Sequence, residues 1–122
     1  MKKDAFLLLM VLCLFSCSDT NDKLNDICGT TDPKEELEWL KGEITTRKRD
    51  VSENAKYYYI TQADFEGQVV FLYSHCDPKA NSAIPVHNCE GELLGAIGKE
   101  FNLDQFVNTE IIFKPIDFAC EE

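Results

Sequence analysis

The stretch YYYITQADFEGQVVFLYSH, residues 57–75, decides the fold because it contains two strand-like runs around a single turn. The runs at 57–63 and 68–75 are rich in aromatic and β-branched residues, which favour strands. The four residues between them, 64–67, end in Gly67, which can take the positive φ that a tight turn needs. This pattern predicts an antiparallel hairpin.

A second hairpin is predicted further along the chain, where runs at 86–89 and 92–97 flank a Glu-Gly pair. The two hairpins together suggest a four-stranded meander. After them, Asn102 is placed to cap one helical turn, and residues 110–114 form a further extended segment.

The run at 68–75 is apolar on both faces, and one helix can cover only one of them. The other face needs a cover of its own, for which three interpretations are open. The segment 101–113, a second copy of the chain or a partner could each shield it.

One helix is predicted before the strands, at residues 33–48. Asp32 fits the N-cap position, Pro33 the first helical position, and Glu35 is placed to reach back in a capping box. Three apolar side chains share one face and should pack on the sheet: Leu37, Leu40 and Ile44. The predicted fold is therefore α+β, with one N-terminal amphipathic helix packed on a four- to five-stranded antiparallel meander sheet, stapled by disulfides.

Residues 1–16 have the organisation of a secretory signal peptide, in which Lys2 and Lys3 precede an apolar run at 6–15. This run falls short of the roughly 20 residues that a transmembrane helix needs. The Leu-Phe-Ser-Cys sequence that ends at Cys17 resembles a lipobox, at which bacterial lipoproteins are cleaved and receive a diacylglycerol on the cysteine sulfur. The resemblance implies lipidation of Cys17 and a membrane partner; cleavage to a soluble secreted protein is the alternative.

Three parts of the chain follow from this: the signal peptide at 1–16, a lipid-anchored acidic tether at 17–27, and a single α+β domain at 28–122. The tether has the composition of a solvated linker. It is also similar to the acidic stretches that act as surface-export signals in lipoproteins of Bacteroides-like bacteria. An outer-membrane location is expected, and surface exposure depends on which interpretation of the tether holds.

The chain is acidic, with 22 Asp and Glu against 12 Lys and Arg and a formal net charge of −10 at pH 7. Nucleic acid is not an expected partner, because its phosphates need a basic patch. An acidic exterior instead suits a soluble surface or a basic protein partner.

Four cysteines remain in the domain, and exported proteins keep disulfides. Of the three possible pairings we favour Cys76 with Cys89, closing the ends of one loop, and Cys28 with Cys120, tying the beginning of the domain to its end. His75 and His87 beside these cysteines raise the alternative of zinc, but the spacing is not that of a zinc ribbon. No metal or cofactor is predicted. No catalytic residue is predicted either, because a disulfide-bonded sulfur is not a nucleophile.

Exposed aromatic residues are the candidates for contact with a partner. Trp39 lies off the apolar stripe of the helix, so it either packs under the segment around Cys28 or the C-terminal tail, or anchors a partner. Tyr57 and Tyr59 are interpreted either as sheet packing or as part of a surface for protein or sugar rings.

The whole layout resembles a group of small uncharacterised lipoproteins of Bacteroides-like bacteria. The residues that carry the resemblance are Pro33, Glu35, Glu36, Leu37, Trp39, Leu40, Lys41, Gly67, Cys76, Cys89 and Gly91. It implies a one-domain lipoprotein and no mechanism. The leading expectation is a non-enzymatic binding or interaction module with a basic protein or a glycan as partner; the alternative is an inhibitor of a cationic hydrolase such as lysozyme.

Overall fold

The computed structural model describes residues 27–121. The predictions about the signal peptide at 1–16 and lipidation at Cys17 lie outside the described residues, and so does the tether except for its last residue, Ile27.

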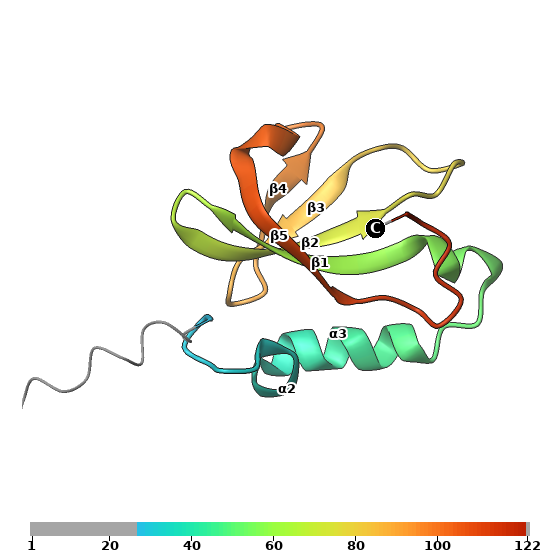
Figure 1. Cartoon of the computed structure of the whole chain (residues 1–122), viewed down its shortest axis with the longest axis horizontal. Coiled ribbons are helices and arrows are strands. Elements are labelled where there is room, and N and C mark those ends of the chain that lie inside the picture. Colours follow the sequence, from blue (N-terminus) through green and yellow to red (C-terminus); the bar gives the residue numbers. More distant parts are fainter. Residues whose placement is uncertain (1–26, 122) are drawn as a thin grey trace, which may run out of the picture.

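The chain forms a helical segment followed by a five-stranded sheet (Figure 1). The helices are α2 (Pro33–Glu36), α3 (Glu38–Lys48) and the 3-10 helices η4 (Glu53–Tyr57) and η5 (Leu103–Gln105). The strands are β1 (Tyr58–Phe65), β2 (Gln68–His75), β3 (Ile84–His87), β4 (Leu93–Ile97) and β5 (Phe106–Phe113). All neighbouring strands pair antiparallel in the order β4-β3-β2-β1-β5. The expected helix and antiparallel sheet are therefore confirmed, although the helical segment does not lie at the N-terminus of the chain.

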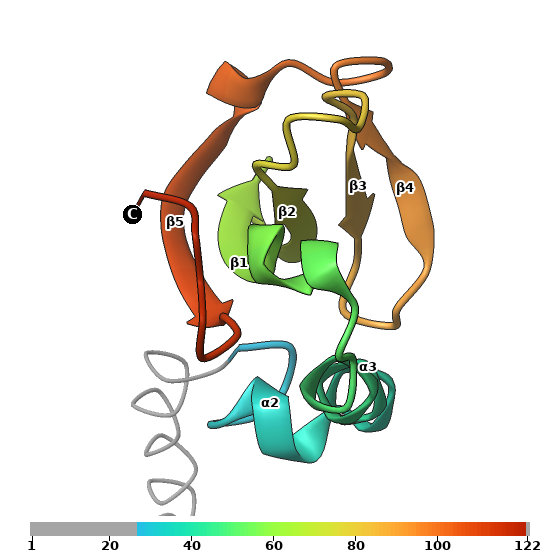
Figure 2. The same ribbon diagram turned by 90° about the vertical axis from the view of Figure 1, so that its right-hand side faces the viewer.

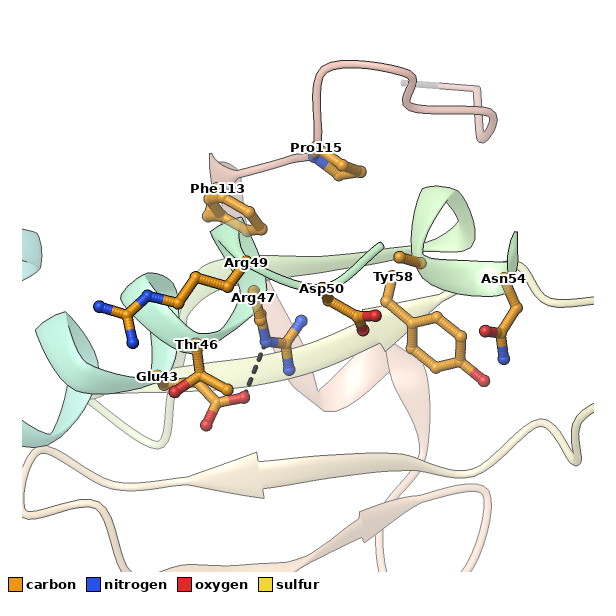
Figure 3. A pocket seen from close by; sticks show the side chains of 10 residues that line it. Glu43, Thr46, Arg47, Arg49, Asp50, Asn54, Tyr58, Phe113 and Pro115 are labelled. Carbon is orange, nitrogen blue, oxygen red and sulfur yellow. Dashed lines mark hydrogen bonds and ion pairs between the residues drawn. The ribbon is translucent and has the colours of Figure 1, made fainter. Parts of the chain in front are cut away.

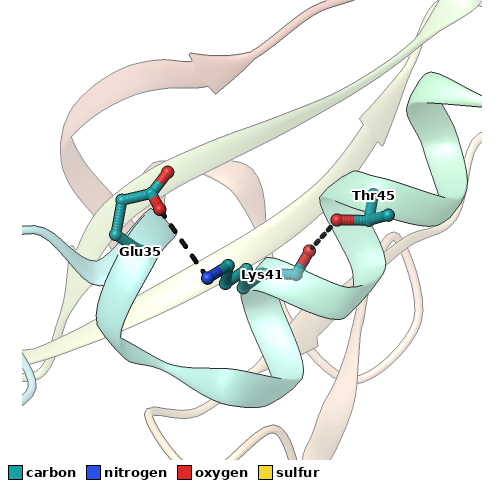
Figure 4. Close-up of polar contacts among 3 residues, drawn as sticks. All are labelled: Glu35, Lys41 and Thr45. Atoms are coloured by element: carbon teal, nitrogen blue, oxygen red, sulfur yellow. Dashed lines mark hydrogen bonds and ion pairs between the residues drawn. The ribbon is translucent and has the colours of Figure 1, made fainter.

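The predicted single helix is interrupted at Leu37, which adopts an extended conformation (φ −89°, ψ 110°). Asp32 is the N-cap as expected, but the carboxylate that reaches back belongs to Glu36, which accepts the Asp32 backbone N–H at 3.2 Å. Glu35 instead pairs across the interruption with Lys41, at 3.9 Å between Oε1 and Nζ (Figure 4). In the same view the Thr45 hydroxyl donates to the Lys41 carbonyl one turn back.

The first hairpin is confirmed, and its turn is tighter than the sequence indicated. Phe65 and Gln68 are a paired position of β1 and β2, so the turn contains only Glu66 and Gly67. Both have positive φ, 51° and 78°, which matches the right-handed twist of the flanking strands.

The second hairpin is also confirmed, and Asn88 organises its turn. The Oδ1 atom of Asn88 accepts the backbone N–H groups of Glu90 and Glu92, at 3.0 and 2.9 Å. Its Nδ2 donates to the Glu92 carboxylate at 2.9 Å. One polar side chain thus provides hydrogen-bond partners for two backbone N–H groups of the turn.

Each face of the sheet has its own core. Figure 2 shows α3 on one side of the sheet. Under α3 the buried residues are Leu40, Ile44, Ile60 and Phe71. On the other face they are Ala63, Val70, Leu72, Val86, Ile97 and Phe106. The second cluster draws on both edge strands, since Ile97 belongs to β4 and Phe106 to β5, so the sheet curls around it. Phe101 packs there too, 5.1 Å from the Phe65 ring centre. The segment 101–113 therefore supplies the cover that the sequence required.

The predicted disulfide pairing is wrong. The structure joins Cys28 to Cys89 and Cys76 to Cys120, with Cα–Cα distances of 5.5 and 5.9 Å.

The reason is the antiparallel register of β2 and β3. Phe71 lies opposite His87, so Cys89 is next to the start of β2, whereas Cys76 follows the end of β2. The position opposite Cys89 and Cys76 itself are seven residues apart along the strand, which is roughly 23 Å at about 3.3 Å per residue. A disulfide tolerates a Cα separation of at most about 7 Å.

Within residues 27–121, no helix is both long enough and apolar enough to cross a membrane.

Candidate functional site

The candidate site is a groove at the C-terminal end of α3, which we call the α3-end groove. It consists of two adjoining cavities of about 530 and 440 Å³. Four residues line both cavities: Arg47, Asp50, Phe113 and Pro115. The groove is thus built by α3, the segment after it, the end of β5 and the residues that follow β5.

Arg47 lies in the middle of the residues that line the larger cavity (Figure 3). Its Nε donates to Glu43 Oε2 at 2.8 Å, and its guanidinium carbon lies 4.7 Å from the centre of the Tyr73 ring. Its side chain is only 16% exposed. The Nη1 atom is buried and has no hydrogen-bond partner among the described residues. The guanidinium is therefore fixed in place with donor capacity left over.

Asp50 also lines both cavities, and its carboxylate accepts hydrogen bonds from Ser52. Its Oδ1 accepts the backbone N–H and the hydroxyl of Ser52, at 2.9 and 2.7 Å. These hydrogen bonds, with a smaller contribution from Arg47, hold the pKa of Asp50 below its usual value. Asp50 therefore remains ionised.

Tyr58 and Asn54 form the wall at the β1 end of the larger cavity. The Tyr58 hydroxyl donates to Asp77 Oδ2 at 2.9 Å. Partial burial first and this hydrogen bond second raise the pKa of Tyr58. The pKa of Asp77 is lowered, mainly by the backbone N–H of Lys79 and also by Tyr58 and Asn54.

A strap formed by residues 114–120 closes the other side of the groove. It is tied down by the Cys76–Cys120 disulfide, by a hydrogen bond from the Ala119 N–H to the Lys56 carbonyl at 3.0 Å, and by a T-shaped contact between the Phe118 and Tyr59 rings. The strap therefore belongs to the rigid frame of the site.

Trp39, the predicted partner contact on the helix, is partly buried and lies away from the groove. Its indole N–H donates to the Cys89 carbonyl at 2.7 Å, and its ring packs edge-on against Phe71 at 5.5 Å. Its ring also lies 6.2 Å from His87. These contacts fasten the β3–β4 turn to the helix.

Tyr57 and Tyr59, the other predicted contacts, are also partly buried and face different surroundings. Tyr59 contacts Phe118 of the strap at a ring distance of 5.2 Å. Tyr57 lines a separate cavity of about 490 Å³ together with Lys56, whose Nζ lies 5.4 Å from the Tyr57 ring centre.

Each of the two histidines packs against a tyrosine ring. His75 stacks on Tyr58 at 5.1 Å, and His87 lies 4.1 Å from the Tyr73 ring. Burial lowers the pKa of His87, and its Nδ1 has no hydrogen-bond partner in the described part of the chain. The thiols that the zinc alternative needs are used in disulfides. Residues 27–121 hold no group of three or more His, Cys, Asp or Glu side chains that could bind a metal ion.

Sequence reasoning missed Arg47 and the groove around it. Arg47 belongs to the basic run at residues 47–49, and basic residues at a helix end are a common feature. A usable signal was the spacing of Trp39, Glu43 and Arg47 at i, i+4 and i+8, which places a second stripe beside the apolar one.

A comparison of this chain with protein-family models, curated proteins and solved structures gives no match.

Proposed function

We propose that the protein is a lipoprotein anchored in the bacterial outer membrane through Cys17, similar to the small lipoproteins of Bacteroides-like bacteria. In this proposal it acts as a non-enzymatic binding module, and the α3-end groove is its ligand site. The leader at 1–16 is removed and the acidic tether holds the domain away from the lipid.

The observation that carries the binding role is the groove itself. A volume of about 530 Å³ is within the range of roughly 300–1,000 Å³ that is typical of small-molecule sites. Its walls come from a helix, two strands and a strap held by a disulfide, so the site exists before a ligand arrives. A preformed site loses less conformational entropy on binding.

The anchoring part is tested by metabolic labelling with radioactive palmitate in a bacterial host that processes lipoproteins. The full chain is expected to incorporate label and to sediment with membranes, and Cys17→Ala is expected to lose both properties. Labelled Cys17→Ala, or unlabelled wild type with its leader intact, would contradict lipidation of this residue.

The binding part is tested by ligand-observed NMR with a small-molecule library and the mature protein in detergent. Thr46 lines the larger cavity and is exposed, so Thr46→Trp should fill the groove and abolish the binding of the hits. Thr109→Trp, at an exposed position of β5 outside the described cavities, is the matched control and should retain them. Hits that bind equally to both variants would place the ligand site elsewhere.

Inhibition of a cationic hydrolase such as lysozyme is the second candidate. It is favoured by the net charge of −10 and by the exposed loop residues 78–82, which follow the disulfide-bonded Cys76. The mature protein should then slow lysozyme in a cell-wall lysis assay, with an association rate that falls as salt rises. No inhibition at an excess of protein would remove this candidate.

A further inference from the structure

The arginines point to the chemistry of the ligand. The chain contains only two arginines, Arg47 and Arg49, and both line the α3-end groove. Arginine offers a planar fork of donors that matches carboxylate and phosphate groups, which lysine cannot do. This placement is notable in a chain with a net charge of −10.

Compensation of the helix dipole does not account for the position of Arg47. Basic side chains at the end of a helix act through charge alone and can remain in water. Lys48, which lines the smaller cavity, is exposed in this way. The Arg47 side chain instead turns inward, is 84% buried, and is held by Glu43 and Tyr73.

The acidic groups nearby leave room for an anion. Glu43 is paired with Arg47. The other charged side chains that line the two cavities are two anions, Asp50 and Asp117, and three cations, Lys48, Arg49 and Lys114, so the groove carries a small excess of positive charge. Arg49 is exposed and forms no ion pair with any residue in the described range 27–121. Its guanidinium is therefore free of an ion pair, and acidic side chains outside the groove are screened beyond about 8–10 Å at physiological salt.

The apolar residues that line the groove indicate the chemistry of the uncharged part of the ligand. Phe113 and Pro115 stand on one side of the cavity, and the Tyr58 ring and Ala55 add further carbon surface. A group that is only charged, such as a free phosphate ion, would leave these walls unused. An apolar or aromatic body would cover them.

We propose that the α3-end groove binds a small organic anion, with a carboxylate or phosphate group beside Arg47 and Arg49 and an aromatic or aliphatic body against Phe113 and Pro115. This inference rests on the proposed binding function and names its ligand class.

The test uses the mature protein in detergent, labelled with ¹⁵N, and four probes: phenylacetate, phenyl phosphate, neutral phenylacetamide and inorganic phosphate. The two aromatic anions should give saturable shifts in the Arg47 Nε–H signal and in the amides of the strap. Phenylacetamide and inorganic phosphate should bind at least about fivefold more weakly, since each lacks one of the two recognised features.

Arg49→Gln should weaken the binding of the two aromatic anions by roughly fivefold, as expected for loss of one charge at the rim of the groove. The affinity of Arg49→Lys should lie between those of Arg49→Gln and wild type. Lys99→Gln, at an exposed position outside the described cavities, removes the same charge and should have no effect. Phenylacetamide binding as tightly as phenylacetate would overturn the anion assignment and leave a groove that still binds ligands. Equal effects of Arg49→Gln and Lys99→Gln would overturn the role of Arg49, and saturable shifts for no probe would overturn the ligand class altogether.

Discussion

At Gly91, both the backbone and the surrounding space require glycine. The residue has a φ of 83°, and a Cβ atom there would lie 2.8 Å from two carbons of the Trp39 ring. Since Trp39 also binds the Cys89 carbonyl, the turn and the indole ring are fitted to each other. The sequence predicted the turn, but a contact across 52 positions of the chain has no local signature.

Gly91→Ala is expected to lower the free energy of unfolding by about 2–4 kcal/mol, from positive-φ strain plus overpacking against Trp39. Gly67→Ala is the matched control, because Gly67 has a φ of 78° and no atom within 4 Å of its added Cβ. It should cost only the strain, about 1–2 kcal/mol. Chemical denaturation measures both; equal losses would contradict the contact with Trp39.

The pH dependence of stability should report on His87. Burial, aided by Arg47 and opposed by Glu43, lowers its pKa in the folded state, and Trp39 and Tyr73 pack around its ring. The unfolded chain therefore takes up a proton first, so stability is full above about pH 6.5 and falls as the pH drops toward the folded pKa.

Denaturation of wild type and His87→Gln between pH 7.5 and 5 measures this effect, and the wild type should show the steeper loss. The hydrogen bonds that lower the pKa of Asp50 and Asp77 act in a different window, below about pH 4. Identical pH profiles for the two proteins would contradict the assignment to His87.

At the scale of elements, the turn between β3 and β4 depends on one side chain. Asn88→Ala removes three hydrogen bonds at once and leaves two turn N–H groups without their acceptor. The expected loss is about 1–3 kcal/mol. Asn81→Ala, which removes one bond to the Ala83 N–H in an exposed loop, should cost less than about 1 kcal/mol. Thermal unfolding of both variants checks this, and an equal loss would show that the turn does not rely on Asn88.

The elements themselves were largely predictable, because their signals are local. The Glu-Gly turn after Phe65, the stripe containing Leu40 and Ile44, and the cap at Asn102 each specify a short segment. The interruption at Leu37 was not predictable, since Pro33 and three acidic residues are all compatible with a continuous helix. The groove was not predictable either, because its walls come from segments that meet only in the fold.

At the scale of the whole molecule, the two disulfides connect distant parts of the chain. Cys28–Cys89 spans 61 positions and ties the segment before α2 to the β3–β4 turn; Cys76–Cys120 spans 44 and ties the strap to the end of β2. The presence of four cysteines alone left three pairings open, and the register of β2 with β3 excludes Cys76–Cys89.

Mass spectrometry of peptides from unreduced protein should find these two pairs. Replacing either pair by serines should lower the free energy of unfolding by about 4 kcal/mol or less in the chain-entropy model. Only loss of Cys76–Cys120 should release the strap and broaden NMR signals at Phe113 and Pro115, with loss of Cys28–Cys89 as the control. A Cys76–Cys89 peptide would contradict the fold.

The place of β5 beside β1 sets the order in which the domain can be completed. The meander from β1 to β4 can assemble before the residues of β5 are available. One flank of β1 stays unpaired until residues 106–113 arrive, and Cys76 waits for its partner until residue 120 does. Folding of this domain therefore ends only when its last residues are in place, and until then one flank of β1 is open to pairing with other chains.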